Sequence, residues 1–70
     1  MKNAPEIIEF LRDLGITAVV FNGRISMDRQ NVADTFGADE VMIAIRDAFG
    51  KGYLIHDGGE GYPYFVSSVY

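Results

Sequence analysis

The chain has 70 residues, which is the size of one domain spanning residues 1–70 and leaves no room for a second. Its 49% hydrophobic content is high for a body that buries only roughly 60% of its unfolded surface, so we expect exposed apolar contact surface. A net charge of −4 with six dispersed bases argues against direct binding of nucleic acid or anionic membranes, and the absence of cysteine excludes disulfides and thiolate metal sites. No apolar run has the length of a membrane span and the N-terminus lacks a signal-peptide core, so we expect a cytoplasmic protein with no membrane association.

The first predicted element is a helix that begins near Asn3 and ends at Gly15. Asn3 and Glu6 have the spacing of a capping box, and Gly15 is suited to a left-handed cap. The apolar positions that recur at helical spacing should form its buried stripe: Ile7, Leu11 and Leu14.

A strand follows over residues 16–21, with apolar side chains on both faces, so we expect it to be covered on both sides or to lie centrally in a sheet. Asn22-Gly23 predicts a tight hairpin turn, because both residues accept positive φ. Residues 24–27 then form a short return strand in one interpretation. In the other, the segment centres on a short helix at 29–36, capped by Asp28, with Val32 and Phe36 facing inward.

A second main helix is predicted over residues 39–49, with Val41, Ile45, Ala48 and Phe49 as its core stripe. Two strands follow, at 53–57 and 64–70, joined by the glycine-rich turn 58–61. The last strand carries apolar residues on both faces. We therefore predict that it is an unpaired sheet edge and the seam of a homodimer, or of an obligate complex with a partner protein.

These elements predict an α+β fold with two main helices against an antiparallel sheet, in the order α-β-β-α-β-β. The alternative order, α-β-α-α-β-β, is that of a winged helix, with residues 58–61 as the tip of the wing.

Few side chains in the sequence point to chemistry. His56 is the only histidine, and with Asp57 and Glu60 it falls short of the ligand number and second shell of a metal site. The turn 58–61 joins two strands, whereas phosphate-binding glycine loops precede a helix. We therefore predict no catalytic, cofactor-binding or metal-binding residues, and a protein that is not an enzyme.

A weak internal echo singles out one helix position. Residues 6–14, EIIEFLRDL, resemble residues 40–48, EVMIAIRDA. On a common helical wheel, Ile43 takes the place of Glu9 in the middle of a charged arc that also contains Arg46. An apolar residue ringed by charges is typical of an interface anchor; the alternative is that residues 24–37 fold over Ile43 and make it core.

The sequence therefore predicts a non-enzymatic protein-binding module. Its expected interface residues combine the helix anchor with the clustered C-terminal tyrosines: Ile43, Arg46, Tyr62, Tyr64 and Tyr70. By association with other small acidic proteins, we expect an inhibitor or regulator of a host nucleic-acid-handling protein, of the phage or mobile-element type. The alternative function is that of a winged-helix DNA-binding transcriptional regulator, which the charge opposes.

Overall fold

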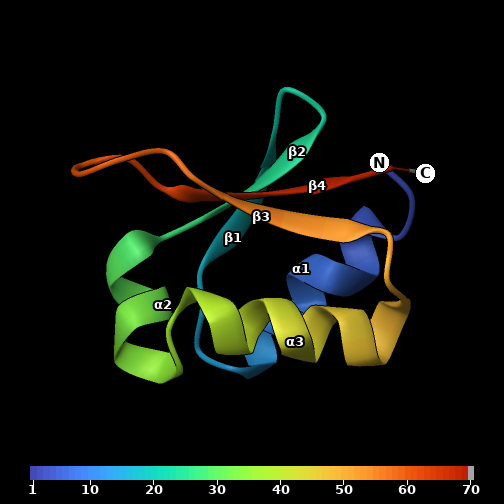
Figure 1. The fold of residues 1–70 in the computed structure, drawn as a ribbon, viewed down its shortest axis with the longest axis horizontal. Coiled ribbons are helices and arrows are strands. Elements are labelled where there is room, and N and C mark those ends of the chain that lie inside the picture. Colours follow the sequence, from blue (N-terminus) through green and yellow to red (C-terminus); the bar gives the residue numbers. More distant parts are fainter. Residues whose placement is uncertain (70) are drawn as a thin grey trace.

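The computed structural model describes residues 1–69 (Figure 1). Their helices and strands follow in this order: α1 (Ala4–Asp13), β1 (Ala18–Phe21), β2 (Arg24–Met27), α2 (Arg29–Thr35), α3 (Ala38–Phe49), β3 (Tyr53–Asp57) and β4 (Tyr64–Ser68). The predicted α+β class is confirmed. Both interpretations of residues 24–37 hold in part, because the return strand and the short helix follow one another.

The four strands form one antiparallel sheet in the order β1-β2-β4-β3, and the three helices of the described chain lie together on one of its faces (Figure 1). The prediction that the C-terminal strand is an unpaired edge is wrong, since β4 lies between β2 and β3. The edges of the sheet are β1 and β3. If β1 is left out, the element order is that of the winged-helix alternative.

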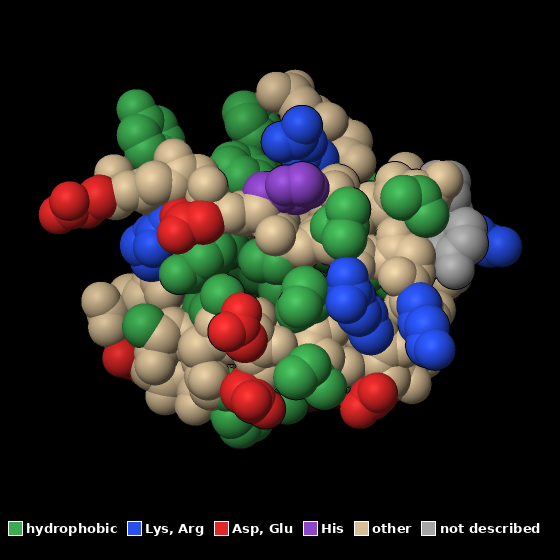
Figure 2. Space-filling view, viewed as in Figure 1, with side chains coloured by type: hydrophobic (Ala, Val, Ile, Leu, Met, Phe, Trp, Pro, Cys, Tyr) green, Lys and Arg blue, Asp and Glu red, His purple; other side chains and the backbone are tan. Residues whose placement is uncertain are grey.

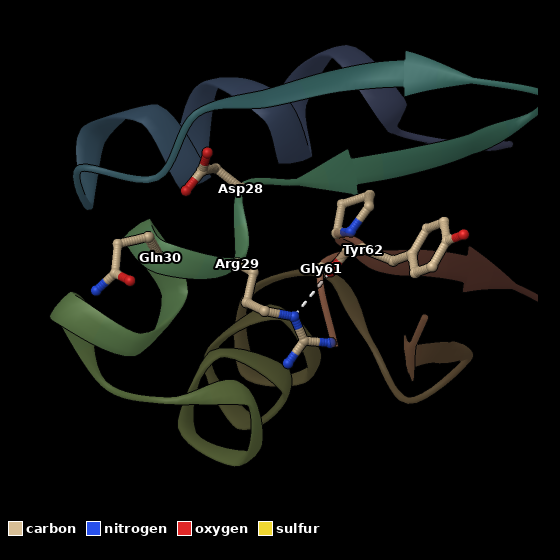
Figure 3. A pocket seen from close by; sticks show the side chains of 6 residues that line it. Asp28, Arg29, Gln30, Gly61 and Tyr62 are labelled. Carbon is tan, nitrogen blue, oxygen red and sulfur yellow. Dashed lines mark hydrogen bonds between the residues drawn. The ribbon is translucent and has the colours of Figure 1, made fainter. Parts of the chain in front are cut away.

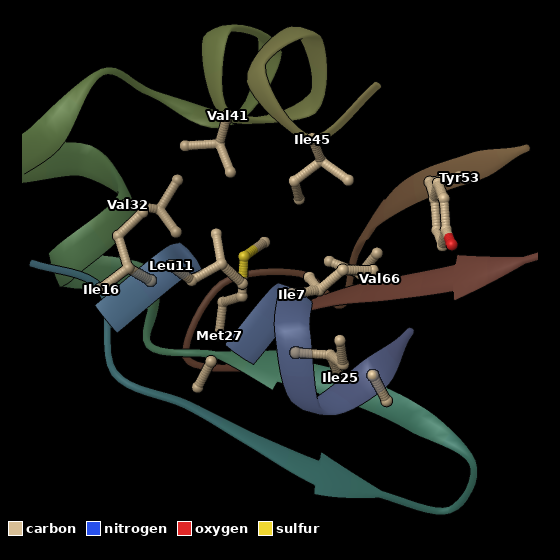
Figure 4. Close-up of a cluster of buried hydrophobic side chains, with 12 residues drawn as sticks. Ile7, Leu11, Ile16, Ile25, Met27, Val32, Val41, Ile45, Tyr53 and Val66 are labelled. Carbon is tan, nitrogen blue, oxygen red and sulfur yellow. The ribbon is translucent and has the colours of Figure 1, made fainter. Parts of the chain in front are cut away.

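The core lies between the sheet and the helical layer (Figure 4). It contains twelve buried hydrophobic residues: Ala4, Ile7, Leu11, Ile16, Ala18, Ile25, Met27, Val32, Val41, Ile45, Tyr53 and Val66. Phe10 of α1 meets Phe49 of α3 edge to face, with ring centroids 5.5 Å apart. Ala48, which we expected in the core, is exposed, and the neighbouring Phe49 is half-buried against the core.

Both predicted ends of α1 are in place, although the first uses a different bond. Asn3 occupies the N-cap position with φ 65°, but its side chain makes no capping bond. It donates instead to the hydroxyl of Tyr53 at 3.0 Å. At the other end Gly15 has φ 90°, and the amide of Ile16 donates back to the carbonyl of Leu11, as in a Schellman cap.

The first strand departs most from its prediction. β1 pairs only with β2, through a two-residue turn in which Asn22 and Gly23 both have positive φ. Ala18 is buried, but Val19, Val20 and Phe21 are exposed, because the end of the hairpin rises away from the helical layer (Figure 1). The apolar residues on both faces of this strand therefore do not indicate burial on both sides.

Tyr53 joins three parts of the chain through polar bonds at the margin of the core. Its hydroxyl accepts from Asn3 Nδ2 and donates to the carbonyl of Lys2 at 3.3 Å, while its own carbonyl accepts from Arg46 Nε at 2.9 Å. Although the residue as a whole is buried, its hydroxyl is satisfied by the segment that leads into α1.

We expect Tyr53→Phe to lower the free energy of unfolding by about 1 kcal/mol, because it leaves the bonds of the N-terminal segment unmade. Tyr62→Phe is the matched control, since the Tyr62 side chain is 64% exposed, and it should leave stability unchanged. Urea unfolding of both variants measures the difference, and equal losses would contradict the role given to the Tyr53 hydroxyl.

Candidate protein-binding surface

The outer face of α3 exposes Ile43, which agrees with the first of its two sequence interpretations. Ile43 is 48% exposed, whereas Ile45, two residues further along the same helix, is buried. The alternative in which residues 24–37 cover Ile43 is therefore wrong. Gly37, with φ 87°, turns the chain between α2 and α3, and its amide donates to the carbonyl of Val32. This turn places the end of α2 beside α3 without covering the middle of its outer face.

Phe36 stands next to this face and extends it. We expected Phe36 to point inward, but it is 55% exposed, because α2 ends at Thr35 and Phe36 is already outside the regular helix. A shallow hollow of about 230 Å³ lies on this corner of the molecule, lined by Phe36, Glu40, Ile43, Ala44 and Asp47. We call the exposed residues Phe36 and Ile43, with this hollow, the α2–α3 corner.

A second hollow of about 320 Å³ adjoins the corner towards the end of α3, and its lining is Ile43, Arg46, Asp47 and Lys51. Ile43 and Asp47 line both hollows, so Ile43 lies between an acidic side and a basic side. Figure 2 shows hydrophobic side chains between acidic ones over α3, with basic side chains towards its C-terminal end. An exposed apolar side chain inside a charged rim is the arrangement found at the centre of protein interfaces.

Arg46 has a structural bond as well as a place on this surface. Its Nε donates to the carbonyl of Tyr53 at 2.9 Å and so ties α3 to the start of β3. The side chain is half-buried, and this bond holds it against the body of the protein at the rim of the second hollow.

Of the predicted tyrosines, Tyr62 and Tyr64 do not join this surface. Tyr62 lines a hollow with Asp28, Arg29, Gln30, Gly61 and Pro63, at the loop between β3 and β4 (Figure 3). Tyr64 is half-buried and lines another hollow, on the side of β4 that faces the helices, with Ala38, Met42 and Ile55 among its neighbours. Tyr70 lies outside the described residues. The structure thus places Ile43 and Arg46 together and puts Tyr62 and Tyr64 elsewhere.

Arg29, the first residue of α2, organises the loop between β3 and β4. Its guanidinium binds the carboxylate of Asp57 and donates to the carbonyls of Gly59 at 2.9 Å and Tyr62 at 2.7 Å. It also donates to the hydroxyl of Tyr64 at 3.2 Å and lies 4.3 Å from the centroid of that ring. Figure 3 shows the Tyr62 ring turned away from Arg29, which reaches only the Tyr62 backbone. Sequence reasoning missed this residue, because its partners are distant along the chain.

The remaining chemistry-bearing side chains make ordinary contacts. His56 Nε2 lies 2.7 Å from Ser67 Oγ on the sheet face that no helix covers. Within residues 1–69, no three His, Cys, Asp or Glu side chains gather where they could hold a metal ion. In the same part of the chain, no helix is long and apolar enough to cross a membrane.

Comparison with known proteins adds no assignment: no family model, no curated protein and no solved structure matches the chain. The function therefore has to be argued from the surface itself.

Asp57 gives the Arg29 cluster a pH dependence. The amide of Gly59 donates to its carboxylate at 2.8 Å, and this bond together with Arg29 lowers the pKa of Asp57 below its ordinary value. A lowered folded pKa adds stability above the unfolded pKa of about 3.9 and loses it as pH falls through the folded pKa.

We expect Asp57→Asn to be less stable than the wild type at pH 6 and to approach it as the pH falls through the folded pKa. Urea unfolding of both proteins, at several pH values from pH 6 down to the folded pKa of Asp57, measures the free energy of unfolding of each as a function of pH. A constant difference at every pH would contradict the role of the Asp57 charge and leave only a packing effect.

Proposed function

We propose that this protein is a non-enzymatic binding module that attaches to a partner protein through the α2–α3 corner. The observation that carries the proposal is the exposure of Ile43 between two hollows, on a helix whose neighbouring residues at Val41 and Ile45 are buried. Partial exposure of Phe36 beside it enlarges the apolar area beyond a single side chain. Burying such a patch is favourable at roughly 25 cal/mol per Å² of apolar surface before the costs of association are subtracted.

The charges around the corner specify the kind of partner surface that fits. Glu40 and Asp47 flank the hollow that contains Phe36, while Arg46 and Lys51 join Asp47 around the other. A complementary partner has an apolar pocket for Ile43 with basic side chains on one side and acidic side chains on the other. Such a rim sets orientation and association rate more than affinity.

We further propose that binding itself is the activity, as in a small inhibitor or regulator that occupies a partner's surface. The partner in this proposal is a host protein that handles nucleic acid, and the acidic protein is of the phage or mobile-element type. Its support is the net charge of −4 together with the acidic start of α3 at Asp39 and Glu40. We also propose a cytoplasmic location, where such partners are found.

The variant Ile43→Glu tests whether Ile43 contributes to partner binding rather than to the stability of the fold. Since Ile43 is half-exposed and lies among charges, the variant should unfold within about 0.5 kcal/mol of the wild type. Ile45→Glu is the matched control on the same helix, and it should lose on the order of 4 kcal/mol, because it buries an unpaired charge. Binding should weaken by at least about 2 kcal/mol in Ile43→Glu, or roughly 30-fold.

The partner assay compares variants. Proteins captured from the native host by the tagged wild type are quantified by mass spectrometry alongside those captured by Ile43→Glu and Leu54→Glu. Leu54 is exposed on the face of β3 that no helix covers, so its variant controls for general loss of an apolar residue. A partner that is lost with Ile43→Glu and kept with Leu54→Glu supports the proposal. A partner retained by both variants rules out the α2–α3 corner as its site.

The winged-helix alternative has one observation in its favour, the order of β2, α2, α3, β3 and β4. In that alternative, α3 would meet the DNA phosphates with Asp39 and Glu40 in its first turn, which opposes binding. We expect no change in the fluorescence anisotropy of short duplex DNA at moderate salt. Salt-sensitive binding that prefers one sequence would overturn this expectation and favour a DNA-binding regulator.

A further inference from the structure

β1 is one of the two edge strands of the sheet, and its outer edge is exposed. β1 pairs with β2 on one side, and the described chain contains no strand on its other side. Val19, Val20 and Phe21 are consecutive, apolar and about half-exposed, with Val20 at 57%. Soluble proteins usually protect such an edge with a charge, a proline or a bulge, because it invites another strand.

The direction of the backbone groups on this edge follows from one hydrogen bond. Arg12 Nη2 donates to the carbonyl of Ala18 at 3.4 Å, so this carbonyl points away from β2. Along an antiparallel strand the two directions alternate from residue to residue. The amide and carbonyl of Val20, two residues on, therefore also point outward, beyond the reach of β2.

We propose that β1 pairs with β1 of a second copy of this chain and forms a homodimer through one continuous sheet. A two-fold axis at Val20 lets the Val20 amide of each copy donate to the Val20 carbonyl of the other. The same register sets Val19 of one copy beside Phe21 of the other, on the sheet face that no helix covers. A β-branched side chain beside an aromatic one is a favourable cross-strand pair.

Charge and position both favour a second copy as the occupant. Residues 17–22 carry no charge of their own, and Arg12, which is bound at Ala18, comes opposite the uncharged Asn22 of the other copy in this register. Residues 19–21 are exposed in the part of the hairpin that rises away from the helical layer (Figure 1). A helix therefore does not block the approach of the second strand.

The seam is short, and this limits its strength. It uses three apolar residues per copy, whereas a standard interface buries roughly 800 Å² and about 20–30 residues on each partner. Arg12 already occupies the outer carbonyl of Ala18, and Asn22 has left the extended conformation with φ 51°. We therefore expect a dissociation constant of about 100 µM, so that the protein is monomeric when dilute and dimeric when concentrated.

Sedimentation of the full chain from about 10 µM to about 1 mM tests the proposal. The wild type should shift from monomer to dimer, and Val20→Lys should remain monomeric, because it places two like charges at the axis. Leu54→Lys is the matched control: Leu54 is exposed on β3, the other edge strand, so its variant should dimerise as the wild type does. Circular dichroism checks that each variant is folded.

Amide exchange provides a readout that does not depend on a substitution. Protection of the Val20 amide should rise with protein concentration, whereas protection of Ile25, buried in β2, should not. A wild type that remains monomeric at 1 mM overturns the proposal, as does a dimer that persists in Val20→Lys. A dimer lost in Ile43→Glu and kept in Val20→Lys would place the seam on α3 and also overturn it. The proposed attachment of a partner protein to the α2–α3 corner does not depend on this result.

Discussion

A single layer of helices covers a single face of the sheet, and this constraint limits how much of the apolar content of residues 1–69 can be buried. The buried residues of the strands, such as Ile25 and Val66, face the helices, whereas those on the other face remain exposed or half-buried. Seventy residues provide enough helix to cover one face, and no described element lies on the second. The high hydrophobic content of the chain is therefore divided between a core and surface patches, as its size requires.

Arg29 connects the two layers at the end where the sheet extends past the helices. It starts α2 and binds the end of β3, the loop and the first residue of β4, so the loop cannot move independently of α2. α2 in turn leads through Phe36 and Gly37 into α3. The position of Phe36 beside Ile43 thus depends on polar bonds made at the opposite end of α2. In this way the Arg29 cluster supports a surface with a proposed binding role.

Local patterns predicted the local structure well. The helices, the Asn22-Gly23 turn, the left-handed Gly15 and the exposure of Ile43 depend on residues within one or two turns of each other. What the sequence did not provide was the strand order, because the pairing of Ile25 with Val66 depends on how the helices bring distant segments together. The same limit hid the partners of Arg29. Phe36 was misplaced by periodicity, which cannot indicate that a helix stops one residue earlier. For β1, apolar residues on both faces indicated burial, when hydrophobicity alone cannot distinguish a covered strand from an exposed edge.

The tight turn between β1 and β2 has a consequence for the order of folding. A hairpin with a two-residue turn closes in about 1–10 µs, whereas β4 must wait for the whole intervening chain and for a long loop to close. Until β4 arrives, the hairpin has two free edges, because β2 still lacks the strand that pairs with it at Ile25 and Met27. A chain leaving the ribosome passes through this state, since residues 1–27 emerge well before residues 64–68. Chains cut short before β4 should therefore aggregate far more readily than the complete protein, because they retain this double edge permanently.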